Sequence, residues 1–212
     1  SGDRKILLGN AITAHENALQ VVTIENDPMR WSYMTVNLAN ALVGYSELLI
    51  GSIEKEKTLE VAIVHMESVV KAWEEGDLWV SGVDLDSNES VFEQEDRIHV
   101  QQQAKIQAFS SLAETYKKRI KGDVKTNYSL AMDAYQKSLE DYYSYIDSLR
   151  ELQDKFDQPI TSKHYKFQMG WVVALANLGL AYLTKVDGDE LDNVNRAIEY
   201  LEDALGIIDR SM

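Results

Sequence analysis

Four segments of the chain share one spacing of residues, and this repeat limits the fold more than any other feature. Each segment begins with Ala, has a larger residue four places on, a residue of modest size seven places on and an aliphatic residue directly after it. These spacings place the shared residues near one face of an α-helix. The sequence therefore predicts related helices around AITAHENAL from residue 11, AIVHMESVV from 62, AMDAYQKSL from 131 and AIEYLEDAL from 197.

A second kind of segment precedes the last three of these. It is NLANAL ending at residue 42, SLAETY ending at 116 and NLGLAY ending at 182. In each, a Leu (Leu38, Leu112 or Leu178) is followed directly by Ala or Gly. A small residue beside a large one lets a neighbouring helix approach closely. The two kinds of segment thus alternate along the chain, which predicts antiparallel helical hairpins.

This pattern resembles the tetratricopeptide repeat family. The resemblance rests on Trp followed by Asn-Leu-Ala or Asn-Leu-Gly in one helix, as at Trp31 and Trp171, and on the Ala-led segments of the other helix. It is similar to the bacterial long-repeat subtype that often accompanies caspase-like protease domains. The repeats here are longer than the usual length of about 34 residues, and the middle one has Lys105 in place of Trp. The resemblance implies an all-α solenoid of stacked hairpins.

The expected organisation is one helical repeat domain over residues 1–212. The dipeptide Ser1-Gly2 looks like the remnant of a removed tag, which indicates a segment excised from a longer protein. Glycines favour helix ends and Asp favours helix starts, so we expect ends near Gly51, Gly76 and Gly122 and a start at Asp123. Seven helices follow, at about 4–23, 29–50, 53–74, 91–120, 124–154, 160–185 and 190–210.

Charge and composition exclude several classes of function. With 35 acidic and 21 basic residues, the net charge is −14, which argues against binding nucleic acid or anionic membranes. The chain has no Cys, which excludes thiolate catalysis and Cys-ligated zinc and favours a cytoplasmic location. No apolar run approaches the ~18 residues of a membrane span.

Catalytic motifs are not apparent in the sequence. The four His residues are scattered without metal-binding spacing, and no glycine-rich loop has the Lys-Ser/Thr ending of a phosphate site. We therefore expect a protein that is not an enzyme and has no cofactor. The one dense basic stretch, 116–125, falls at a predicted helix end, where cations interact favourably with the helix dipole.

An acidic loop at 75–90 is the longest predicted break between helices, and its Leu78 and Trp79 are expected to be exposed. Oxygen-bearing side chains partly match a calcium-binding EF-hand loop, but Glu89 stands where that loop needs Gly. A capping box from Ser90 to Glu93 is the preferred interpretation. The alternative calcium ligands are Asp84, Asp86, Asn88 and Glu95.

The resemblance implies a concave groove that binds a protein partner, in the form of a peptide or a helix. A regulatory segment controlling a fused effector domain and an acidic chaperone for a basic partner are alternatives, and a second copy of the chain is another occupant. The repeat positions that would line the groove are Tyr33, Val36, Asn40, Gln107, Ser110, Glu114, Lys117, Val173, Ala176 and Leu180. On the last of these helices the row continues to Leu183, and we expect a bound helix, a second copy or a following segment to cover it. The alternative is that the helix expected at 124–154 or the loop at 75–90 folds across it.

Overall fold

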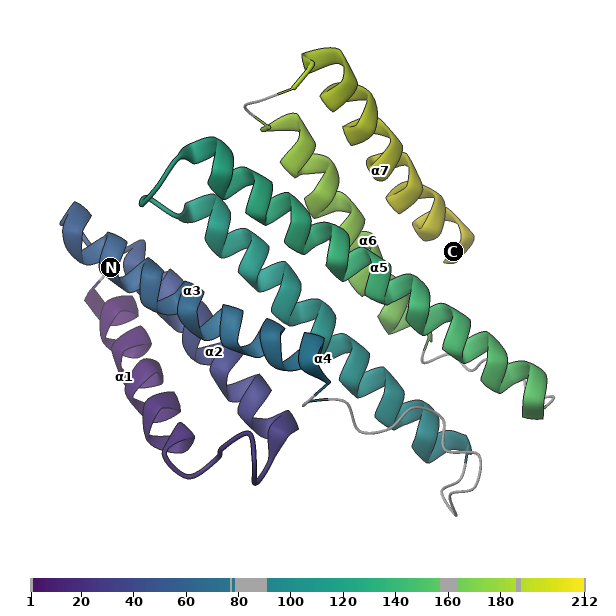
Figure 1. Ribbon diagram of the computed structural model, residues 1–212, viewed down its shortest axis with the longest axis horizontal. Helices are drawn as coiled ribbons and strands as arrows, with labels where there is room; N and C mark the ends of the chain where they lie inside the picture. The colour runs from purple at the N-terminus through teal and green to yellow at the C-terminus, as the bar shows by residue number, and fades with distance from the viewer. Residues whose placement is uncertain (1, 77, 79–90, 157–163, 186–187, 212) are drawn as a thin grey trace. The chain divides into compact units, whose positions relative to one another are not determined.

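A computed structural model describes the whole chain except residues 1, 77, 79–90, 157–163, 186–187 and 212. Within that part the protein contains seven helices and no strand, which confirms the predicted all-α class (Figure 1). The helices are α1 Gly2–Leu19, α2 Pro28–Ser46, α3 Ser52–Glu75, α4 Val91–Lys118, α5 Val124–Phe156, α6 His164–Leu183 and α7 Glu190–Ser211. None of them, as far as the chain is described, is long and apolar enough to cross a membrane.

The chain divides into two compact units. The first unit comprises residues 1–79 and 111–131, and the second comprises 80–110 and 132–212. Helices α4 and α5 each contribute one part to each unit. The first unit therefore contains α1, α2, α3, the end of α4 and the start of α5. The expectation of one repeat domain over the whole chain stays a prediction.

Helices α1 and α2 both end earlier than predicted, and a polar turn follows α1. Helix α1 ends at Leu19, and Thr23 and Asn26 then bond to one another through side chain and backbone. Helix α2 begins with Pro28 in its first turn, where Pro leaves no donor unpaired, and ends at Ser46. Gly51, which was expected to end α2, is instead the N-cap of α3, with a φ of −82°.

Other predicted helix ends are confirmed, and their chemistry is local. Gly76 and Gly122 have φ of 84° and 87°, a left-handed conformation that Gly adopts without strain. The Asp123 carboxylate accepts a hydrogen bond from the Thr126 backbone amide at 2.9 Å, and so caps α5. Asn127 then donates to the Arg119 and Lys121 carbonyls, which satisfies acceptors at the end of α4.

Several of the residues that define the repeat lie in the core. Leu38, Leu112 and Leu178 are all buried, as are the leading alanines of α3, α5 and α7. Helix α6 and helix α7 approach so closely that a Cβ added at Gly179 would lie 2.9 Å from Leu201 Cγ. The prediction that small residues sit at helix crossings is therefore confirmed at this hairpin.

Most of the predicted loop at 75–90 lies outside the described residues. This applies to Trp79, to Ser90 of the capping box and to three of the four candidate calcium ligands. Glu75 belongs to α3 and Leu78 is described. Leu78 is fully buried, so the expectation that it is exposed is wrong.

Candidate binding surfaces

The predicted groove residues are divided between the two units. The second unit holds those of α6 together with Gln107 and Ser110 of α4, and its surfaces are described separately from those of the first. The first unit holds Tyr33, Val36, Asn40, Glu114 and Lys117.

In the first unit, Val36 does not line a surface. Its side chain is 4% exposed and belongs to the core of α2, so its assignment to a groove is wrong. Tyr33 is half-buried, and this burial raises the pKa of its phenol. Asn40 is exposed, and its amide donates to the Ser111 hydroxyl at 3.4 Å. Asn40 therefore joins α2 to α4 within this unit.

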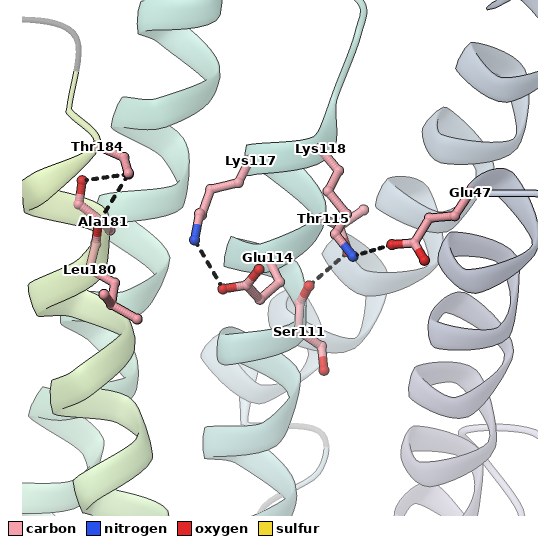
Figure 2. Close-up of polar contacts among 9 residues, drawn as sticks. All are labelled: Glu47, Ser111, Glu114, Thr115, Lys117, Lys118, Leu180, Ala181 and Thr184. Carbon is pink, nitrogen blue, oxygen red and sulfur yellow. Dashed lines mark hydrogen bonds and ion pairs between the residues drawn. The ribbon is translucent and has the colours of Figure 1, made fainter.

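The charged residues at the end of α4 make contacts of two kinds, which Figure 2 shows. Lys117 lies 3.2 Å from Glu114 of the same helix, whereas Lys118 reaches Glu47, just beyond α2, at 2.7 Å. The hydrogen bond from Lys118 lowers the pKa of the Glu47 carboxyl. The pair on α4 is local, and the second pair ties α4 to the α2–α3 hairpin.

The end of α4 also bonds to α3. Arg119, just past α4, donates two hydrogen bonds to the Glu60 carboxylate, both at 2.7 Å, and these lower the pKa of Glu60. The Tyr116 hydroxyl donates to the Glu67 carboxylate, which lies two helical turns after Glu60 on α3. Burial of Tyr116, followed by this hydrogen bond, raises the pKa of its phenol. The basic stretch expected to act through the helix dipole thus makes specific contacts that attach α4 to α3.

In the second unit, α6 carries an exposed aliphatic row. Val173, Leu180 and Leu183 are each about half exposed, and Ala176 is partly exposed. They lie along one side of the helix, since residues three, four and seven apart share a face. The Thr184 hydroxyl donates to the backbone carbonyls of Leu180 and Ala181 at the end of this helix (Figure 2). The row is therefore exposed in the described part of the chain, and its role in a groove stays a prediction.

The remaining groove residues of the second unit lie on α4. Gln107 is exposed. The Ser110 hydroxyl lies 3.2 Å from that of Ser138 on α5, and Ser138 also donates to the Ile106 carbonyl at 3.4 Å. Ser110 therefore takes part in the contact between α4 and α5.

Lys105, which replaces the Trp of the other two repeats, forms an ion pair in the same hairpin. Its ammonium lies 2.6 Å from the Asp141 carboxylate, and both side chains are mostly buried. Burial raises the pKa of Asp141, and the hydrogen bond from Lys105 opposes this. The middle hairpin thus holds its helices together with a charged pair at a position where the others use an aromatic ring.

A further apolar row on α7 was not anticipated from the sequence. Leu191, Val194, Ile198 and Leu205 are between 36% and 67% exposed. With Leu183 of α6 they form a surface that we call the end face of the second unit. The signal was present in the sequence, because these α7 residues and Leu201 recur at alternating spacings of three and four. Of this row, the repeat pattern includes only Leu205.

No group of three or more His, Cys, Asp and Glu residues able to hold a metal ion occurs among the described residues. Comparison of the chain with protein-family models, with curated proteins and with solved structures finds no match. The proposal below therefore rests on the residues and surfaces of this chain.

Proposed function

We propose that this chain is a non-catalytic interaction scaffold of the tetratricopeptide repeat type, which binds a peptide or helix from a protein partner. The observation that carries the proposal is the exposed row on α6, where Val173 and Leu180 are about half exposed two turns apart. Grouped aliphatic side chains on a surface mark interaction sites more often than scattered ones do.

The geometry of the row suggests the form of the ligand. Val173 and Leu180 are seven residues apart, which places them about 10 Å apart along a helix. Aliphatic side chains of an amphipathic helix recur at the same interval and bind apolar surfaces of this kind. Asn177, partly exposed between them, offers an amide that both donates and accepts hydrogen bonds. A ligand helix with two aliphatic residues seven apart and a polar group between them matches this row.

Selection from a displayed library of helical peptides tests the proposal. We expect selected peptides to carry aliphatic residues four or seven apart, and to lose binding to Leu180→Asp. Val64→Asp is the matched control, because Val64 is a similarly exposed aliphatic residue on α3. It should bind the same peptides as the unchanged chain. Equal binding by Leu180→Asp, with an unchanged helical circular dichroism signal, would show that the row on α6 is not the binding surface.

A further inference from the structure

Four of the five end-face residues occupy positions that are buried elsewhere in the same chain. The Ala-led segments of α3 and α7 align with Ala62 opposite Ala197, so Ile63 corresponds to Ile198. Ile63 is 2% exposed, whereas Ile198 is 46% exposed. The other aligned pairs behave alike: Leu59, Val70 and Val43 are buried in the first unit, and Val194, Leu205 and Leu183 are exposed in the second.

In the first unit, the end of α4 is bonded to α3, the helix that carries three of these buried positions. The end of α4 bonds to Glu60 and Glu67 of α3. On the helical wheel of α3, Ile63 lies between the core-facing Ala62 and these two acidic residues. A segment that bonds to them therefore passes over Ile63 and its neighbours. The end face thus has the residues of a surface built to be covered by a helix.

The spacing along α7 identifies a helix that fits. The apolar residues follow intervals of three, four, three, four and three, which is the seam of a coiled coil. Such a seam pairs with another of the same spacing, and α7 of a second copy supplies it. The six seam residues are Leu191, Val194, Ile198, Leu201, Leu205 and Ile208.

We infer that the end face joins two copies of this chain, through antiparallel packing of α7 against α7 about a two-fold axis. A two-fold contact uses the same surface on both copies. With the axis between Ile198 and Leu201, all six seam residues meet apolar partners. At the rim, Asn195 then lies opposite Glu202 of the second copy, so that an amide donor meets a carboxylate. The seam itself contains no charged residue.

The exposed area is sufficient for such a dimer. Five aliphatic side chains, each roughly half exposed, amount to a patch on the order of 400 Å², comparable with the largest patch on a typical monomer. Two such faces with their polar rims remove roughly 1,000 Å² or more from water, the lower bound for a stable specific interface. This inference uses α7 and does not rest on the proposed ligand row of α6.

Sedimentation analysis over a range of concentrations, on the full chain, tests the inference. We expect a dimer whose dissociation constant rises at least about tenfold in Ile198→Glu. Val64→Glu is the control and should remain dimeric. Two copies that each carry a charge of −14 repel one another, so added salt should strengthen the association. A chain that stays monomeric at every concentration, or a dimer that Ile198→Glu leaves intact, overturns the inference.

Single cysteines test the orientation of the helices, because the chain contains no Cys of its own. In the antiparallel arrangement, two copies of residue 198 are offset by about 4.5 Å along the axis, and two copies of residue 205 by about 16 Å. A short bismaleimide should therefore crosslink Ile198→Cys efficiently and Leu205→Cys poorly. Efficient crosslinking at both positions indicates parallel helices and overturns the arrangement. Loss of crosslinking at both overturns the interface.

Discussion

The first hairpin, α2–α3, and the last hairpin, α6–α7, are built on the same pattern but end in different surroundings. Both bury the Leu of the first helix and the leading Ala of the second. In the first hairpin the side beyond that core is buried, and the end of α4 bonds to it. In the last hairpin the aligned side is exposed along α7.

The two hairpins show that two contributions to the fold are separate. The contact between the two helices of a hairpin is specified by residues within that hairpin. Whether the outer side of the hairpin is buried or exposed depends on whether another helix is present to cover it. A core position and a binding position can therefore have the same local sequence pattern, and burial alone distinguishes them.

The largest expected effect is common to both hairpins. Leu38→Ala and Leu178→Ala should each lower the free energy of unfolding by roughly 2–5 kcal/mol, as buried large-to-small changes do. Urea denaturation followed by circular dichroism measures this. Similar losses at the two sites support the aligned register. A loss below about 1 kcal/mol at either site, well under the usual cost of truncating a buried Leu, would show that the two hairpins do not share this register.

The next prediction concerns the outer side, where the hairpins should differ. Ile63→Ala should lower the free energy of unfolding by roughly 2–5 kcal/mol because Ile63 is buried. Ile198→Ala should cost below about 1 kcal/mol, because a half-exposed side chain loses little on truncation. The measurement requires low protein concentration, at which association of α7 does not contribute. Equal costs at the two positions would mean that Ile198 is covered within one copy of the chain.

A smaller difference is expected at the helix crossing, where Ala39 corresponds to Gly179. The first hairpin accommodates a methyl group there, since Ala39 is fully buried. An added Cβ at Gly179 would meet Leu201 Cγ at 2.9 Å and the Ala197 carbonyl oxygen at 3.1 Å. Gly179→Ala should therefore destabilise the second unit by roughly 1–3 kcal/mol, the usual cost of overpacking. A thermal melt with no loss of stability would show that the two helices separate at little cost.

The sequence predicted most of this architecture because the repeat is a local property. Helical periodicity was sufficient to place Leu38, Leu112 and Leu178 in the core and to locate seven helices. The end of α2 was missed because Ser46 to Gly51 carries no strong stop signal before the glycine. Val36 was wrongly placed on a surface because its position was transferred from a family pattern. The end face was missed because coverage by another helix is a tertiary property that the repeat pattern does not report.

The smallest expected effect concerns the charged contact that covers the first hairpin and has no counterpart in the last. Glu60 accepts two hydrogen bonds from Arg119, while the aligned residue on α7 is Asn195, which does not titrate. Because Arg119 lowers the pKa of Glu60 in the folded chain, the pair contributes stability above the unfolded pKa of about 4.3. That contribution is lost as the pH falls through the lower, folded value.

Glu60→Gln should therefore cost about 1 kcal/mol at neutral pH, since the pair is bidentate but partly exposed to solvent. The difference from the unchanged chain should shrink towards zero as the solution is made more acidic than the unfolded pKa. Urea denaturation at a series of pH values measures it, and Asp133→Asn, at an exposed carboxylate on α5, is the control that should show a smaller change. If the cost of Glu60→Gln is the same in acid as at neutral pH, the contact with Arg119 does not depend on the charge of Glu60. The attachment of α4 to the first hairpin would then rest on its other contacts, among them those of Lys118 with Glu47 and of Tyr116 with Glu67.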